Sequence, residues 1–585
     1  MILDDNLKIT ASFPLEYEVE NLFDDYGIRC RNVKFLYDKV VNELLERKIT
    51  VDFTFPMLDI CGRWFPTCSF DRSVKADWFP GTESMTSISA PVICFYNQDG
   101  ENKHTIALSE IKQKITMKYG VHEEDGTMMC RTEIVLPKGL FPKEYQLKIW
   151  ESVNSEPYWN TLCNVNRWWE ENLGLNFMEV SDVARQPLYS FWYSKHQQVD
   201  AENIERESLL AAKMGFTTII VDDGWQTDDS NRGYAFCGDW EPSANKFSDF
   251  AAHVRKVQSM GLKYMMWFSV PYLGKNTKTW DRFQDKVLCY DEFQQAGVLD
   301  LRYPEVREYL KSIYVKAVRE WNIDGLKLDF IDEFYLRPES PVYSEGMDFA
   351  DIQEALDVFL TDVMKELQAL RPDVLIEFRQ RYIGPQIRKY GNLLRVSDCP
   401  GSGISNRVGT IDLRLLSGET AVHSDMLMWH RDEKPEDAAL QVISCIFSTV
   451  QISLELENIT DEMKKMLTFW MNFMRKHMKL LQTAQIQPQE PENLYPEVQV
   501  EDEHTRILVH YSRGRVVDIR EFSQEVYYVH GTKEEQICFR LTKEESVAYQ
   551  VMDCMGNTVE EGNWISEKWG SLSVPTGGII RITKM

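Results

Sequence analysis

The sequence is short of positive charge. Its 585 residues include 65 lysines and arginines against 91 aspartates and glutamates, which gives a net charge of −26 at pH 7. A chain this acidic lacks the positive field that holds phosphate backbones, and an anionic membrane surface would repel it. We therefore expect no nucleic-acid partner and no membrane partner, and we interpret the excess of carboxylates as a solubility feature.

Long apolar runs and closely spaced cysteines are also missing. The longest uncharged run, residues 438–454, is diluted by Gln, Ser and Thr, which indicates buried core and not a membrane span. The twelve cysteines include no C-x-x-C pair, which argues against a zinc cluster or a disulfide framework. The first residues, MILDDNLKITASF, have neither the basic nor the apolar part of a secretory signal. We expect a cytoplasmic protein.

Three sequence textures follow one another along the chain. Residues 1–180 contain short alternating segments such as ITVDFTF and EYQLKIW, which predict an N-terminal β-sandwich with a linker helix at about 157–172. Residues 181–488 alternate apolar strands with amphipathic helices. Residues 489–585 return to short alternating segments, which predict a small C-terminal antiparallel β-domain.

The middle region predicts a barrel. Its eight apolar segments cover residues 188–194, 217–223, 263–269, 325–330, 374–378, 393–397, 420–424 and 450–454. Eight βα units in about 300 residues are typical of a (β/α)8 TIM barrel. The alternative is a doubly wound open sheet, which usually has fewer strands and often a phosphate-binding loop after the first strand. No G-x-G-x-x-G sequence follows LYSFWYS, so we predict the barrel.

The barrel rule selects candidate residues before any reaction is known, because TIM-barrel active sites lie at the carboxyl ends of the strands. The selected ends carry Trp192, Tyr193, His196, Asp222, Asp223, Trp267, Lys327, Asp329, Glu377, Arg379, Asp398, His423 and Asp425. Aromatic faces and carboxylates together suit a sugar, whose C–H face stacks and whose hydroxyls donate. Two carboxylates on different strands can flank a glycosidic bond, one as nucleophile or base and the other as acid.

Structural explanations compete with the functional ones. Asp329 can cap the next helix, and the sequences around Asp398 and Asp222-Asp223-Gly224 can be simple turns. His423, on an apolar strand, is typical of a satisfied core histidine. However, Lys327 shares a strand face with Asp329, and inward-facing Lys and Asp are costly unless they are used. The carboxylates lack the spacing typical of metal ligands, so we expect no metal.

These segments together resemble glycoside hydrolase family 36, in the clan of retaining α-galactosidases and α-N-acetylgalactosaminidases. Residues 219–225 (IIVDDGW) resemble its strand-two signature, and residues 325–329 (GLKLD) resemble its Lys-x-Asp nucleophile strand. Residues 298–301 (VLDL) and 304–307 (PEVR) match its lead-in to that strand. Ser397-Asp398 resembles its acid/base, 69 residues after Asp329 (398 − 329 = 69), as two βα units would give. The order of sandwich, barrel and β-domain also fits the family.

The resemblance implies double displacement at a terminal α-linked, galactose-like residue of an oligosaccharide. Asp329 would attack the anomeric carbon, and Asp398 would protonate the leaving oxygen and then deprotonate water. Retaining chemistry predicts about 5–5.5 Å between the two carboxyl groups. Asp222 and Asp223 would accept from O4 and O6, Lys327 would donate to hydroxyls, and Trp192 and Trp267 would form walls. The resemblance implies no cofactor, a small oligosaccharide or glycoside as partner, and a homo-oligomer.

The sequence departs from the family in ways that leave the sugar open. The family's Cys- and Gly-rich turn after strand five is replaced by a segment with Arg379, in a region that faces the sugar's 2-position in the clan. Asp398 is followed by Cys-Pro-Gly and not Asn-Thr, and we take Arg407 as the arginine that usually follows. A divergent member acting on a galactoside, an N-acetylgalactosaminide or another α-glycoside, by hydrolysis or transglycosylation, is compatible with this. The alternative of another class is a non-catalytic sugar-binding protein, against which both carboxylates argue.

Overall fold

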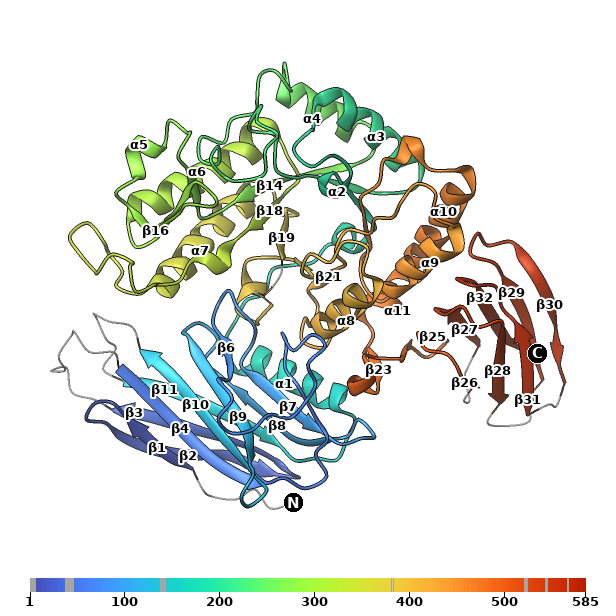
Figure 1. The fold of residues 1–585 in the computed structure, drawn as a ribbon, viewed down its shortest axis with the longest axis horizontal. Helices are drawn as coiled ribbons and strands as arrows, with labels where there is room; N and C mark the ends of the chain where they lie inside the picture. Colours follow the sequence, from blue (N-terminus) through green and yellow to red (C-terminus); the bar gives the residue numbers. More distant parts are fainter. Residues whose placement is uncertain are drawn as a thin grey trace. The chain divides into compact units, whose positions relative to one another are not determined.

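The computed structural model describes residues 7–36, 47–136, 144–379, 381, 383–519, 524–541, 546–565 and 568–585 (Figure 1). The chain forms two compact units. The first comprises Met1–Glu179, Gln226–Ser243 and Trp267–Asn392, and the second comprises Val180–Trp225, Ala244–Met266 and Leu393–Met585. One border between the units, at 179/180, lies next to the predicted border at residue 180, and none lies near residue 488; the predicted domain bounds stay predictions.

The N-terminal part of the first unit is the β-sandwich that the alternating pattern predicts. One sheet has the order β1 (Lys8–Ala11), β4 (Arg47–Pro56), β10 (Thr127–Leu136), β9 (Ile115–His122) and β6 (Thr82–Ser84). The other has the order β2 (Glu16–Asp25), β3 (Ile28–Leu36), β11 (Glu144–Ser152), β8 (Asn102–Leu108), β7 (Val92–Tyr96) and β5 (Gly62–Trp64). Alternate side chains of both sheets, such as Val33, Ile49 and Phe95, are buried in one shared core.

The predicted linker helix is confirmed as α1 (Tyr158–Asn172). Its Trp169 is fully buried, and the indole donates to the carbonyl of Leu108 on β8 at 2.9 Å. One turn earlier in the helix, Asn166 accepts a hydrogen bond at 2.7 Å from the buried side chain of Arg388. Because Arg388 belongs to the 3₁₀ turn Ile387–Lys389 after the fifth barrel strand, α1 ties that part of the barrel to the sandwich.

The eight predicted barrel strands are confirmed, each overlapping its predicted segment. They are β12 (Leu188–Ser190), β13 (Thr218–Val221), β14 (Lys263–Ser269), β18 (Gly325–Asp329), β19 (Leu375–Arg379), β20 (Leu393–Arg395), β21 (Ala421–His423) and β22 (Gln451–Ile452). They form one sheet in the order β21-β20-β19-β18-β14-β13-β12-β22. The first strand pairs in parallel with the last, and the parallel bridges His423–Thr449 and Leu427–Ile452 connect the two ends of this order. The sheet is therefore a nearly closed parallel barrel.

Helices follow the strands in the βα order that the pattern predicts. The main ones are α3 (Ala201–Lys213), α4 (Phe250–Gln258), α6 (Pro304–Trp321), α7 (Ile352–Leu370), α8 (Gly403–Arg414), α9 (Pro435–Ser444), α10 (Asp461–Lys476) and α11 (Met478–Thr483). Local chemistry sets where several begin. Asp200, Asp249 and Ser402 each accept a hydrogen bond from a first-turn amide of the helix that they precede, and α6 begins at Pro304.

The first barrel strand is shorter than predicted. The segment 188–194 was expected to be strand throughout, but it ends at Ser190, and Trp192–Lys195 forms the single-turn helix α2. The physical reason is a side-chain acceptor: Ser453 Oγ receives the amide hydrogens of Tyr193 and Ser194, both at 3.0 Å. These amides are thereby satisfied without a strand partner.

The C-terminal β-domain is also confirmed. Its larger sheet has the order β23 (Gln487–Gln489), β24 (Glu497–Glu501), β25 (Thr505–His510), β27 (Glu525–His530), β32 (Ile579–Lys584), β29 (Val547–Met552) and β30 (Thr558–Trp564). The smaller sheet contains β26 (Val516–Ile519), β28 (Gln536–Leu541) and β31 (Trp569–Ser573). Most neighbours are antiparallel, but β25 with β27 and β26 with β28 are parallel. Among the described residues of the whole chain, none of the helices combines the length and apolarity that a membrane crossing requires.

Candidate active site

Asp329 is the last residue of β18, and its side chain is almost completely buried, at 4% exposure. The next residue, Phe330, has a φ of 65°, in the left-handed region that bulky residues rarely occupy. This turn directs the Phe330 amide back to Asp329 Oδ1 at 2.8 Å. Such local backbone strain is typical of functional positions, where the surrounding structure enforces it.

The carboxylate of Asp329 is held from two neighbouring strands. Trp267 on β14 donates its indole Nε1–H to Oδ2 at 2.8 Å, and Arg379 at the end of β19 donates its Nε–H to Oδ1. The parallel register explains the second contact, since Lys327 is level with Glu377 and the same offset places Asp329 beside Arg379. Converging donors are what an ionised carboxylate accepts, and they fix its orientation.

Aromatic rings surround this carboxylate. Tyr234 stacks on Tyr272 with ring centroids 4.9 Å apart, and it lies 5.0 Å from Phe330 and 6.0 Å from Trp267. The guanidinium of Arg379 lies over the Phe330 ring, 4.7 Å from its centroid. The nucleophile candidate is thus set in a mostly apolar wall, which is the environment that the C–H face of a sugar requires.

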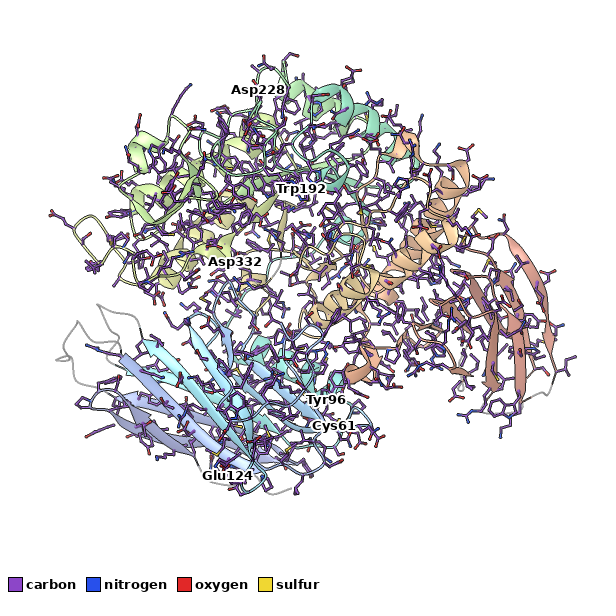
Figure 2. The ribbon with its side chains drawn as sticks, viewed as in Figure 1. Cys61, Tyr96, Glu124, Trp192, Asp228 and Asp332 are labelled. Atoms are coloured by element: carbon purple, nitrogen blue, oxygen red, sulfur yellow. The ribbon has the colours of Figure 1, made fainter. Side chains whose placement is uncertain are left out.

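The loop after β19 is attached to the N-terminal sandwich. Ser89 donates its amide hydrogen to the carbonyl of Arg381 at 2.6 Å, and the Arg381 side chain pairs with Asp332 at 3.0 Å, in the turn after β18 (Figure 2). Gly384 is required here, because a Cβ atom at that position would lie 2.6 Å from the carbonyl oxygen of Ser89. The sandwich therefore helps to fix the segment that presents Arg379.

Asp222 and Asp223 follow β13 in the second unit, and both are buried. Asp223 accepts from the side-chain amide of Gln197 at 2.6 Å, and Asp222 Oδ1 accepts from the backbone amide of Asp223 at 2.9 Å. Gly224 has a φ of 109°, and a Cβ there would lie 2.4 Å from Gln197 Cα. The tight DDG turn therefore packs directly on the backbone that carries Gln197.

Trp192, a predicted pocket wall, and Trp225, which follows the DDG turn, have different surroundings. Trp192 is half-buried on α2 (Figure 2), with its ring 4.7 Å from that of His196. Trp225, after the DDG turn, is fully buried and stacks on Phe250 of α4 at 6.3 Å. Trp192 is thus available for a ligand contact, whereas Trp225 belongs to the core.

Asp398 follows β20, and its side chain is 43% exposed. It accepts a hydrogen bond at 2.8 Å from Nη2 of Arg395, which is itself 1% exposed at the end of β20. The other terminal nitrogen of the same guanidinium, Nη1, is 2.5 Å from the fully buried carboxylate of Asp425. One arginine therefore joins a solvent-accessible carboxylate to a buried one.

Two predicted substrate ligands have partners of their own. Lys327 is buried on the same face of β18 as Asp329. Arg407 is also buried, and its guanidinium donates to the carbonyl of Leu494 at 3.0 Å and lies over the Tyr511 ring at 4.5 Å. These contacts connect α8 to the C-terminal β-domain and involve no substrate. The substrate role of Arg407 stays a prediction.

Sequence reasoning did not select Arg395, and it gave no role to Tyr193 and Asp425, although both lie at strand ends that the barrel rule selects. The signal was present for Arg395, because a charged side chain inside the apolar segment LLRVS is costly to bury unless it is paired. For metals there is no comparable signal: in the described part of the chain, no group of three or more His, Cys, Asp or Glu side chains is arranged to hold an ion.

The chain is similar in sequence to known proteins over its middle region. The model of the melibiase family matches residues 182–484. A probable α-galactosidase C from Aspergillus flavus is 26% identical over 161 residues, which cover 25% of this chain and 21% of that protein. The α-galactosidase AgaA from Geobacillus stearothermophilus is 23% identical over 156 residues, again 25% and 21% of the two chains. The aligned stretch thus spans about a fifth of the length of these curated relatives.

Solved structures agree in fold over nearly the whole chain. AgaA from Geobacillus stearothermophilus, a family 36 α-galactosidase solved with 1-deoxygalactonojirimycin, superposes with a TM-score of 0.64 at 15% identity, over 98% of this chain and 81% of that one. The α-galactosidase from Lactobacillus brevis gives a TM-score of 0.60 at 13% identity, over 99% and 86%. Since the family model covers more than half of the sequence, the chain belongs to the melibiase family.

Proposed function

We propose that this chain is a retaining, exo-acting glycoside hydrolase that removes terminal α-linked galactose-like residues from oligosaccharides. The observation that carries the proposal is the carboxylate of Asp329, buried at the end of β18 and oriented by Trp267 and Arg379. Family membership supports it, as do the structural neighbours: AgaA of Geobacillus stearothermophilus has been solved with raffinose and with stachyose.

The proposed reaction is a double displacement. Asp329 attacks the anomeric carbon while Asp398 protonates the leaving oxygen; water, deprotonated by Asp398, then releases the sugar from Asp329. The guanidinium of Arg379 on Asp329 Oδ1 has its largest effect in the second step, because the departing group there is the carboxylate whose charge it stabilises.

Substrate selection is proposed to come from buried acceptors. Asp222 and Asp223 accept from the O4 and O6 hydroxyls, Lys327 donates, and Trp192 and Trp267 provide the apolar walls. A sugar with the wrong hydroxyl geometry leaves a buried acceptor unpaired, which costs about 1–3 kcal/mol. Arg379 is proposed to lie beside the sugar's 2-position. A cytoplasmic location, a homo-oligomeric assembly and independence of cofactors are parts of the same proposal.

The test is a panel of nitrophenyl glycosides: α-galactoside, α-N-acetylgalactosaminide, α-glucoside and β-galactoside. Wild type should cleave an α-glycoside, and Asp329→Ala should reduce turnover by more than about 10⁴-fold. Asp281→Ala, which removes an exposed carboxylate of α5 (Trp280–Phe283), is the matched control and should keep wild-type rates. NMR of the first-formed sugar should show the α-anomer, as retention requires.

Two other outcomes of this panel would contradict the proposed function. If wild type cleaves none of the four glycosides but calorimetry shows that it binds galactose, the non-catalytic sugar-binding alternative replaces the proposal. If the first-formed product is the β-anomer, the reaction is inverting and the nucleophile role of Asp329 is wrong.

A further inference from the structure

The second unit contains a buried carboxylate, Asp425, that shares the guanidinium of Arg395 with Asp398 and has no role in the proposed reaction. Asp425 lies two residues after β21 and is completely buried. Its Oδ1 is paired with Nη1 of Arg395, and its Oδ2 accepts from the Tyr193 hydroxyl at 2.9 Å and from the backbone amide of Cys399 at 2.6 Å. A carboxylate satisfied in this way is fixed in place, and it fixes its partners in turn.

The backbone of Asp425 is held as firmly as its side chain. Asn406 on α8 accepts the Asp425 amide hydrogen at 2.9 Å and donates to its carbonyl at 3.1 Å. The pairing of β21 with β20 places Asp425 close to Arg395, since His423 pairs in register with Arg395. Asp425 is therefore a rigid anchor, and the guanidinium that reaches Asp398 is held on that anchor.

The charges around Arg395 indicate that Asp425 does more than hold the guanidinium in place. Arg395, Asp398 and Asp425, which we call the Arg395 cluster, contain one positive charge and two carboxylates. A guanidinium paired only with Asp398 would favour its ionised form, which is unsuited to donating a proton. With Asp425 paired to the same guanidinium, part of that stabilisation is already used, and a proton on Asp398 becomes less costly.

We propose that Asp425 is a positioning residue for the acid/base: it orients Arg395 toward Asp398 and balances its charge, so that Asp398 can gain and lose a proton. The proposal rests on the proposed function, in which Asp398 is the acid/base. It assigns roles to Asp425 and Arg395, which have none in the prediction from sequence.

The other titratable groups around Asp425 do not change charge in the working range. Three of them are the Tyr193 hydroxyl of α2, the thiol of Cys399 and the thiol of Cys445 after α9, and burial raises the pKa of all three. The fourth is His423, which pairs in register with Arg395 and stays neutral because burial lowers its pKa to about 3. Burial raises the pKa of Asp425 itself, against the opposing effect of Arg395. The charge balance therefore involves the Arg395 cluster alone among these neighbours.

The first experiment replaces Asp425 by Asn, which keeps the shape and removes the charge. The guanidinium then acts on Asp398 alone, so Asp398 should lose its proton at lower pH. With raffinose as the unactivated substrate, the alkaline limb of the kcat/KM profile should move down by about one pH unit. With a dinitrophenyl galactoside, which needs little protonation, kcat at pH 6 should stay within about threefold of wild type.

The second experiment makes the opposite change. Arg395→Gln removes the positive charge, so the alkaline limb should move to higher pH. Tyr193→Phe removes a hydrogen bond to Asp425 without changing any charge, and its limb should stay at the wild-type position. Shifts of opposite sign in two variants of one cluster are not produced by general loss of structure, and thermal denaturation of each variant verifies that it is folded.

The outcomes separate this inference from the proposed function. If Asp398→Ala behaves as the loss of an acid/base but neither Asp425→Asn nor Arg395→Gln moves the alkaline limb, Asp425 is a structural residue and the inference is overturned. If Asp398→Ala slows activated and unactivated substrates equally, the acid/base assignment itself fails. If Asp425→Asn does not fold, Arg395→Gln decides alone by the sign of its shift.

Discussion

Asp329 ends barrel strand β18 and Asp398 lies three residues after β20, but the two carboxylates are held in different ways. Asp329 is buried among aromatic rings and oriented by an indole, a guanidinium and a backbone amide. Asp398 is 43% exposed, and the guanidinium that holds it is shared with another carboxylate. A nucleophile must be aimed and remain ionised, whereas an acid/base must exchange protons with the solvent. The difference in surroundings matches the difference in the proposed tasks.

The largest effect is expected when the exposed carboxylate, Asp398, is removed. Asp398→Ala should lower kcat/KM for raffinose by about 10²–10⁴-fold, because general acid catalysis contributes that much. Dinitrophenyl galactoside should be spared in the glycosylation step, and added azide should restore turnover by replacing the water that Asp398 activates. Steady-state rates with both substrates, with and without azide, measure this.

A smaller effect is expected when a hydrogen-bond donor to the buried carboxylate, Asp329, is removed. Arg379→Gln removes a charged donor from Asp329 Oδ1, and the loss of such a hydrogen bond should lower kcat by about 10–100-fold, because the carboxylate departs in the second step. The matched control is Arg381→Gln, two residues along, whose exposed side chain pairs with Asp332 and should matter less than about threefold. Equal losses in both variants would mean that the loop, and not the contact with Asp329, is what matters.

The smallest expected effect concerns the strand that leads to Asp425. His423 on β21 is fully buried, with ring nitrogens 2.7 Å from the Ala184 carbonyl and 3.1 Å from Gln451 Nε2, which confirms the core histidine predicted from sequence. Burial lowers its pKa to about 3. Between that value and the unfolded value of about 6.5, only the unfolded chain binds the proton, so acidification below pH 6.5 destabilises the fold.

This dependence can be isolated by substitution. One histidine of this kind costs about 1.4 kcal/mol of unfolding free energy per pH unit, or about 2 kcal/mol between pH 6.5 and 5. His423→Gln should therefore lose less stability on acidification than wild type, although it is less stable at pH 7. Urea unfolding at both pH values measures the difference, and parallel losses in the two proteins would contradict the assignment. Burial also lowers the pKa of His253, His477 and His530, so the comparison with wild type is essential.

The same two regions show what the sequence can and cannot predict. Strand periodicity locates all eight barrel strands, and the barrel rule then selects Asp329 and Asp398 at strand ends. The partners of these residues depend on register, which periodicity does not specify between parallel strands. The contact of Arg379 with Asp329 follows from the pairing of Lys327 with Glu377, and that of Arg395 with Asp425 follows from the pairing of Arg395 with His423.

The wrong prediction for the length of the first barrel strand has a different cause. The segment LYSFWYS reads as one strand, but the hydroxyl of Ser453, more than 250 residues later, captures two of its amides. No local pattern carries that information. The same limit applies to Arg407, whose neighbours Leu494 and Tyr511 come from a different part of the chain.

The backbone hydrogen bond from Ser89 to Arg381 has a consequence for how this enzyme family can diversify. The segment that presents Arg379 is braced by a turn of the N-terminal sandwich, with Gly384 leaving no room between them. A substitution in that turn can therefore shift Arg379 without altering any barrel residue. Under the proposed function, adaptation to a new sugar can begin outside the barrel. A barrel transplanted without its sandwich would carry the proposed catalytic carboxylates but lose the contact that holds the segment of Arg379.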